Sequence, residues 1–118
     1  MENIEKTVMD WLNESPDLSN HPSAFDVPSN RPERFISIER TGGSTGTYMD
    51  ESLVSVFVWD TSRWNASQAC ESAVERLKSM HELPEVALCE IISHYNNPDP
   101  VSGSPRYQIN CRIVTHII

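Results

Sequence analysis

The sequence is 118 residues long, which fits one domain, and folding at this size buries roughly two-thirds of the surface exposed by the unfolded chain. Hydrophobic residues make up 38% and charged residues 22%, a composition typical of globular proteins and unlike that of disordered segments. The formal net charge is -8, with only nine Lys and Arg residues, so ordinary nucleic-acid recognition is not expected. The acidity either keeps the protein soluble or suits a channel through which DNA slides without sticking, because like charges repel within a screening length of about 10 Å.

Neither export nor membrane insertion is indicated. The polar start MENIEKTVMDWL does not resemble a signal peptide, and no apolar run approaches the roughly 18 residues that span a bilayer. Three cysteines, Cys70, Cys89 and Cys111, have no metal-like spacing. We therefore expect a cytosolic origin with reduced and mostly buried thiols.

The first helix is expected at residues 2–14. Its apolar stripe follows helical spacing and consists of Ile4, Val8, Trp11 and Leu12. Ser15-Pro16 ends it, because the residue before a proline avoids the α region. Residues 16–33 then contain four prolines and are expected to form an extended connector, in which a short strand around Ala24–Val27 belongs at a sheet edge.

A hairpin follows, because two runs rich in β-branched and aromatic residues, Arg34–Thr41 and Glu51–Trp59, flank a glycine-rich segment. The segment Gly42–Gly46 is expected to be a flexible loop, since glycine tolerates positive φ. A phosphate cradle is not expected there, because the segment has no lysine and joins two strands. We interpret it as a hairpin tip that reaches a neighbouring subunit, with an idle surface loop as the alternative.

The second helix is expected from Asn65 to about Met80, with Asn65 as its cap and Gln68 completing a capping box. Its apolar face is rich in small residues, which allow close approach to a sheet. That face consists of Ala66, Ala69, Cys70, Ala73, Val74, Leu77 and Met80. Leu83-Pro84 ends this region.

The last two strands are expected at Val86–Tyr95 and Arg106–Ile117, joined by a proline-rich loop at Asn96–Pro105. In the final strand one face is expected to be core and the other not, because the residues alternate strictly. The candidate core face consists of Tyr107, Ile109, Cys111, Ile113, Thr115 and Ile117.

These elements predict a single α+β domain over residues 1–118, in the order α-β-β-α-β-β. Its sheet is expected to be antiparallel or mixed with four to five strands, and two helices are expected on one face. The strand Glu51–Trp59 is apolar on both faces, since Leu53, Phe57 and Trp59 alternate with valines. Burying one valine-sized side chain stabilises a protein by about 1.5–3 kcal/mol, so the second face needs a cover. Either a neighbouring subunit covers it or the two helices pack on opposite faces.

Catalytic, cofactor and metal sites are not expected. None of the carboxylates has an obvious partner acid or nucleophile, and no hydrolase-elbow, zinc-protease or dinucleotide motif is present. His94 and His116 come near Cys89 and Cys111 in the last two strands, but such residues are more typical of core or rim positions than of zinc sites. His21 lies in the connector, where a solvated side chain is expected.

Three stretches together resemble the tail terminator (tail completion, or head-tail joining) proteins of long-tailed, siphovirus-like bacteriophages. They are VPSNRPERFISIERTGG at 27–43, the strand Leu53–Trp59 with the Thr61-Ser-Arg that follows it, and NPDPVSGSPRYQIN at 97–110. With the first helix, the resemblance covers nearly the whole chain. Each stretch alone is weak evidence of the resemblance, which rests on the order and spacing of all three.

The resemblance implies a structural virion protein with no enzymatic activity and no cofactor. Proteins of this kind form a hexameric ring that caps the tail tube, ends its polymerisation and docks to the neck connector of the head. DNA passes through the ring without sequence-specific binding. Assembly in the host cytoplasm and a final location in the tail and neck follow. The alternatives are another head-tail connector component, such as a head-closure ring, and an acidic inhibitor or DNA mimic.

Candidate interface residues follow from this role. The planar guanidinium of arginine suits bidentate pairing with a carboxylate of a neighbouring subunit, which favours Arg34, Arg40 and Arg106 as interface residues. Tyr107, which follows Arg106, is predicted to join them. Trp64 is added because aromatic side chains dominate interfaces, and Gly42 and Gly43 because they lie in the hairpin segment. The alternative for each arginine is an ordinary surface ion pair worth about 0–1 kcal/mol.

Overall fold

The computed structural model describes residues 3–27, 29–30 and 32–117, so Glu2, Pro28 and Arg31 lie outside the described residues. The described elements are helix α1 (Ile4–Asn13), strands β1 (Ser23–Ala24), β2 (Phe35–Thr45) and β3 (Met49–Trp59), helix α2 (Arg63–Lys78), and strands β4 (Val86–Asn96) and β5 (Arg106–His116). Short 3-10 helices lie at Pro16–Leu18 and Met80–Glu82. The predicted α+β class is confirmed, with a mixed sheet of five strands.

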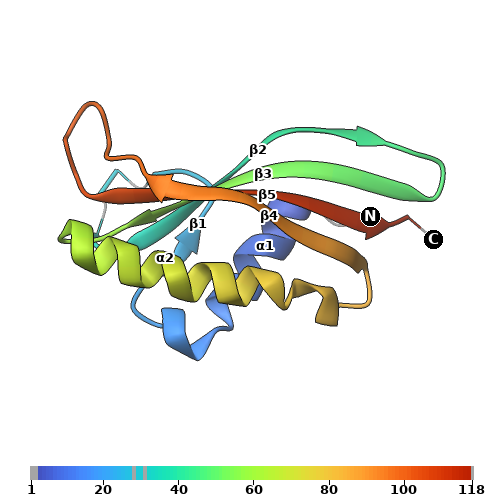
Figure 1. Cartoon of the computed structure of the whole chain (residues 1–118), viewed down its shortest axis with the longest axis horizontal. Helices are drawn as coiled ribbons and strands as arrows, with labels where there is room; N and C mark the ends of the chain where they lie inside the picture. Colours follow the sequence, from blue (N-terminus) through green and yellow to red (C-terminus); the bar gives the residue numbers. More distant parts are fainter. Residues whose placement is uncertain (1–2, 28, 31, 118) are drawn as a thin grey trace.

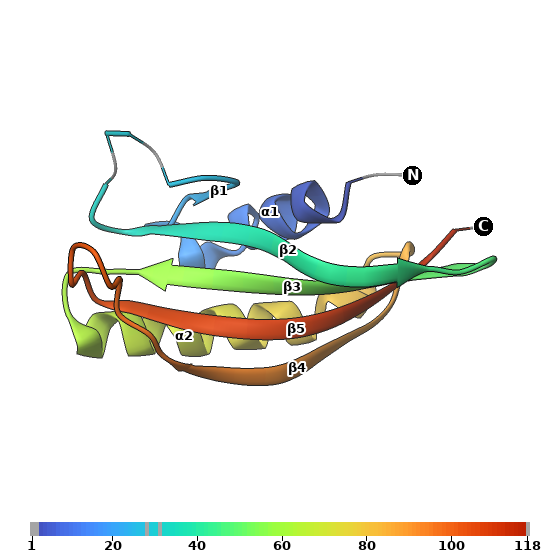
Figure 2. The ribbon, with the colours of Figure 1, turned by 90° about the horizontal axis from the view of Figure 1, so that it is seen from above.

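The strands form one sheet in the order β1-β2-β3-β5-β4, which can be followed in Figure 2. β1 runs parallel to β2 and pairs only with Ile36 and Ser37, whereas the other pairings are antiparallel. The short strand therefore lies at a sheet edge as predicted, but at Ser23–Ala24 and not at Ala24–Val27. β5 inserts between β3 and β4, which leaves β4 as the opposite edge.

Both helices pack on the same face of the sheet (Figure 1). The alternative in which they cover opposite faces is therefore wrong. α1 packs against β2, and α2 packs against β3, β5 and β4. Leu12, Leu77, Val56 and Ile109 are fully buried between the layers. The alternation predicted for the last strand is confirmed from Ile109 to Thr115, where the buried residues face the helices and those between them are only half-buried. Ile117, also predicted on the core face, lies beyond β5 and is exposed.

The two helices are braced by a reciprocal pair of side chains, Trp11 and Arg76. The Trp11 indole Nε1 donates to the Arg76 carbonyl at 2.7 Å, and Arg76 Nε donates to the Trp11 carbonyl at 2.8 Å. The Arg76 guanidinium also lies 3.5 Å from the centre of the Trp11 ring. Cation–π contacts of this kind are worth about 0.5–2 kcal/mol, so this pair fixes α1 against α2.

The predicted cap of α2 is wrong by three residues. Ser62 is the N-cap, and its Oγ accepts a hydrogen bond from the Asn65 N–H at 3.1 Å. Asn65 lies within the first turn, where its side chain donates to Thr61 Oγ1. A serine side chain caps a helix as well as asparagine does, so the local pattern did not distinguish them.

The predicted loop at Gly42–Gly46 is also wrong, because β2 continues to Thr45 and β3 begins at Met49. The chain reverses in a tight turn, in which the Gly46 N–H donates to the Met49 carbonyl at 2.9 Å. Gly43 has a φ of +142°, and a Cβ there would lie 2.2 Å from the Glu51 carbonyl oxygen. The glycines therefore permit close strand pairing after the bulge between Arg40 and Gly42, and they do not loosen the chain.

Candidate subunit interface

The sheet face opposite the helices is called the open face here. By strand register it carries Phe35, Ser37, Glu39, Glu51, Leu53, Ser55, Phe57, Trp59, Leu88, Glu90, Ser93, Tyr95, Arg106, Gln108, Asn110, Arg112 and Val114. Leu53, Phe57 and Trp59 share this face, as their alternation predicts. No helix in the described part of the chain covers it (Figure 1).

The middle of the open face is polar and satisfies its own hydrogen bonds. Ser55 Oγ donates to Asn110 Oδ1 at 2.8 Å, and Asn110 Nδ2 donates to Ser93 Oγ at 3.1 Å. Gln108 Nε2 also donates to Asn110 Oδ1, at 2.9 Å. This row of side chains crosses β3, β5 and β4, so the middle of the face needs no apolar cover.

One end of the open face is closed by the chain itself. The ring of Trp59 stacks on Phe35 with 4.9 Å between centroids, and its Nε1 donates to Ser37 Oγ at 3.2 Å. The Arg106 guanidinium lies over both Phe57 and Trp59, about 5 Å from each ring centre. Trp59 is therefore buried within its own chain and needs no cover from a neighbouring subunit. Leu53 and Phe57 remain half-buried.

Arg106, predicted as an interface residue, is engaged in contacts of its own chain. Its Nε donates to the Asn97 carbonyl at 2.8 Å, and it forms an ion pair with Asp99 at 3.9 Å. The Ser102 hydroxyl, with the nearby charge of Arg106 contributing, lowers the pKa of the Asp99 carboxyl. Arg106 therefore anchors the loop between β4 and β5 to the aromatic end of the sheet.

Arg34 is exposed and borders a cluster around the buried residues His21 and Asp60, which sequence reasoning missed. His21 Nε2 lies 2.8 Å from Asp60 Oδ2, and Arg34 Nε lies 3.3 Å from Asp60 Oδ1. Burial raises the pKa of Asp60, but hydrogen bonds from the Thr61 N–H, His21 and Arg34 outweigh it, so that the pKa lies below its usual value. His21 is buried and not solvated as expected, because its partner comes from the end of β3. No local pattern signals a pair 39 residues apart.

Arg40, Gly42 and Gly43 lie together at the root of the hairpin arm, the segment 42–52 that projects beyond both helices (Figures 1 and 2). Arg40 is exposed, its Nε donates to the Gly42 carbonyl at 3.2 Å, and its backbone N–H donates to Glu5 Oε2 at 3.1 Å. These three residues form one group, whereas Arg34 and Arg106 lie near the opposite end of the sheet.

The two predicted aromatic residues differ in environment. Trp64 lies in the first turn of α2 with 70% of its surface exposed, which makes it a free aromatic side chain on the surface. Tyr107 is half-buried on the helix side of β5 and packs against the core. Trp64 is therefore a stronger interface candidate than Tyr107.

The outer edge of β4 is a further candidate for which no residue was predicted. Ile92 is 55% exposed, and Leu88 and Tyr95 are also exposed along the same strand. Among the described residues, no strand pairs with the outer side of β4. The signal in the sequence was the run of large apolar residues in Val86–Tyr95, which cannot all face one helix layer.

Other chemistry finds little support in the described residues. Nowhere in ranges 3–27, 29–30 and 32–117 do three or more His, Cys, Asp and Glu residues gather as metal ligands would. The three cysteines form no disulfide in the described chain, and burial raises the pKa of Cys70 to about 12. The helices of the described part are too short or too polar to cross a membrane.

Comparison with protein-family models and with curated proteins gave no match for this chain. The resemblance to tail terminator proteins therefore stays a prediction.

Proposed function

We propose that this chain is a structural subunit that assembles with copies of itself into a ring, of six copies as the resemblance implies, and that the ring caps the tail tube of a long-tailed phage. In this role it ends polymerisation of the tube protein and offers a docking surface to the neck connector. DNA passes through its central hole. The subunit needs no catalytic residue and no cofactor for this work.

The observation that carries the proposal is that strand edges on both sides of the sheet lack a strand partner in the described chain. β4 has no partner on its outer side. β2 pairs with β1 at Ile36 and Ser37 and its Arg40 N–H is bonded to Glu5, so its unpaired edge lies in the arm beyond Arg40. Unpaired strand edges are templates for pairing with another chain. Pairing β4 of one copy with β2 of the next joins two different patches, which is the heterologous contact that generates a closed ring.

Three further features agree with this assembly. The bulges in β4, between Val86 and Leu88 and between Ile91 and Ser93, limit indiscriminate edge pairing. The hairpin arm projects beyond the helices (Figure 2), and the side chain of Trp64 is exposed, so both are accessible to adjacent copies. A ring also multiplies the formal charge of -8 on each subunit, so a lumen of this composition repels the DNA backbone and does not retain it.

The assembly can be tested by mixing the purified chain with tail tubes built from the tube protein encoded beside it. Negative-stain microscopy of the tube ends and native mass spectrometry measure whether a ring forms and how many copies it holds. We expect rings at one end of the tubes and tubes of arrested length. Tubes that keep growing, with no added density at their ends, contradict the proposal.

An edge variant with a matched control identifies the contact. Ile92→Lys places a charge on the outer edge of β4, and we expect it to prevent ring formation without unfolding the monomer. Val101→Lys makes the same change at a loop residue that is 94% exposed, and we expect it to assemble normally. Equal assembly by both variants rejects the edge contact.

The acidity favours a second candidate, an inhibitor that mimics DNA. A mimic acts as a monomer or dimer and competes with DNA for a basic protein, whereas a ring subunit does not. Competition for a DNA-binding target, with no density on tube ends, selects this candidate. A ring found at the head side of the neck selects a head-closure role instead.

A further inference from the structure

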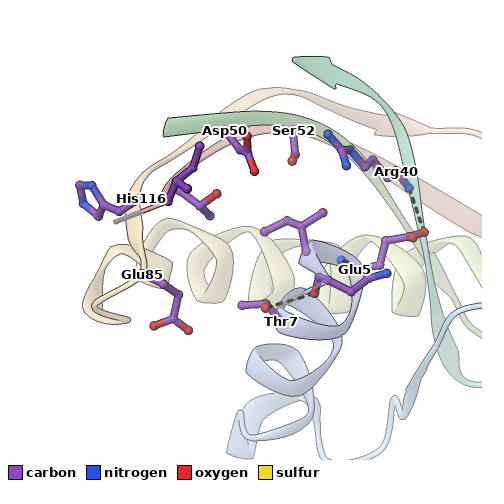
Figure 3. Close-up of a pocket in the computed structure, with 11 residues that line it drawn as sticks. Glu5, Thr7, Arg40, Asp50, Ser52, Glu85 and His116 are labelled. Atoms are coloured by element: carbon purple, nitrogen blue, oxygen red, sulfur yellow. Dashed lines mark hydrogen bonds between the residues drawn. The ribbon is translucent and has the colours of Figure 1, made fainter. Parts of the chain in front are cut away.

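A pocket lies beneath the hairpin arm, between the sheet and the start of α1 (Figure 3). Its volume is about 440 Å³, within the range of about 300–1,000 Å³ that is typical of ligand sites. The first turn of α1 forms its floor, and the adjoining ends of β3 and β5 form its roof. The helix layer does not fill this part of the sheet, because the strands extend beyond the helices.

The most unusual group in the pocket is Asp50. Its side chain descends from β3 into the cavity, beside Ser52 (Figure 3). Asp50 is only 5% exposed, and its Oδ1 atom has no hydrogen-bond partner among the described residues. A buried carboxylate oxygen without a hydrogen bond is unfavourable, so native structures nearly always compensate such an atom.

The charges around the cavity do not compensate Asp50. Glu5 and Glu85 add two carboxylates to the lining. The cationic groups are Arg40, whose side chain extends along the roof toward Ser52 and donates from Nε to the Gly42 carbonyl, and His116, whose ring points away from the cavity in Figure 3. Within the described chain, neither of them forms an ion pair with Asp50.

The chemistry of the lining selects the kind of cation. Asp50 stands among hydroxyl groups, those of Ser52 and Thr115, and apolar side chains, those of Ile4 and Ile117. A guanidinium matches this set, because its planar fork donates several hydrogen bonds at once to carboxylate and hydroxyl oxygens. The apolar side chains suit the methylene stem of an arginine, which packs along nonpolar surface. The geometry points to a binding pocket for an arginine side chain, with Asp50 as its principal acceptor.

A second copy of this chain is the source of that arginine, an assignment that rests on the proposed self-assembly and adds a contact along the long axis of the molecule to the lateral pairing of β4 with β2. Arg63 is exposed at the first position of α2, directly before the exposed Trp64. The start of α2 and the pocket lie at opposite ends of the long axis of the molecule (Figures 1 and 2). One end of the molecule offers a cation and an aromatic ring, and the opposite end offers a carboxylate pocket. The two ends are therefore complementary in a head-to-tail contact.

The pocket itself is tested with arginine amide, independently of any ring. We expect saturable shifts of the amide NMR signals of Ser52 and Thr115 on titration, with a Kd on the order of millimolar, and none with citrulline amide, its neutral analogue. Asp50→Asn has nearly the same shape and is expected to weaken binding about tenfold or more. Asp17→Asn removes an exposed carboxylate elsewhere and is expected to bind normally. Thermal unfolding of both variants verifies that they fold.

The absence of saturable shifts with arginine amide, or equal binding by Asp50→Asn, overturns the pocket even if rings form on tail tubes. The source is tested separately by Arg63→Gln in the tube assay, with Lys78→Gln, which removes the same charge from an exposed residue of the same helix, as the control. We expect Arg63→Gln to impair ring formation and Lys78→Gln to leave it unchanged. Intact rings with Arg63→Gln reject Arg63 as the occupant. Failure of every variant and of the wild-type chain to form rings is instead a failure of the proposed function.

Discussion

Replacing Asp60 with asparagine tests the buried cluster that ties the connector to the end of β3. The amide has nearly the same shape as the carboxylate and keeps an oxygen that accepts the Thr61 N–H, which donates at 2.6 Å. The change therefore creates no cavity, but it removes the charge that faces His21 and Arg34. Hydrogen bonds to charged groups contribute about 1.5–3 kcal/mol when buried, and the half-exposed Arg34 contributes less. We expect Asp60→Asn to lower the free energy of unfolding by about 2 kcal/mol.

Thermal and urea unfolding followed by circular dichroism measure this loss. In a domain of this length about 1 kcal/mol corresponds to roughly 3–5 °C in Tm, so the variant is expected to melt roughly 6–10 °C lower. Asp17→Asn removes the same charge from an exposed position and is expected to stay within about 2 °C of the wild type. If the two variants melt together, the cluster does not stabilise the fold and the reasoning is refuted.

The same cluster predicts that stability depends on pH, and the close approach at Gly43 predicts that a larger side chain there destabilises the arm. Because the pKa of Asp60 is lower in the folded chain than in the unfolded chain, its stabilising effect is complete above about pH 5 and is lost as the pH falls toward the folded pKa. Urea titrations from pH 7 down to pH 3 measure this, and Asp60→Asn is expected to lose less stability than the wild type over that range. Gly43→Ala is expected to destabilise the arm by about 1–3 kcal/mol, since its Cβ meets the Glu51 carbonyl. Gly42→Ala has an ordinary contact with Leu53 and serves as the control in the same unfolding assay, where equal stability of the two variants contradicts the close-approach argument.

The local patterns of the sequence predicted the elements well wherever one face of an element is buried. The stripe of Val8, Trp11 and Leu12 gave α1, and the alternation around Ile109 and Ile113 gave the core face of β5. The errors fall where the residue type is ambiguous on its own. Glycine at position 43 suits either a loop or a close pair of strands. In the structure it pairs with Ser52 of β3, so the close pair is what forms.

The candidate site was much less accessible from the sequence. The arginine, tryptophan and glycine residues were predicted as interface residues from their residue type alone. In the structure these residues lie in different environments. Trp64 and Arg40 are exposed, whereas Arg106 is used to hold the loop that follows β4. The contacts of Arg106 were not foreseen because the aromatic rings beneath it come from β3, a strand distant in the chain.

Sequence alone determined the α+β class, the acidic character and the buried faces of the elements, because these depend on composition and on periodicity within a few neighbouring residues. Only the tertiary structure decided that both helices share one face, that His21 meets Asp60, and that Asp50 faces Thr115 across β3 and β5 at the roof of a pocket. Such pairs depend on strand order and register, and these are set by the packing of the whole chain.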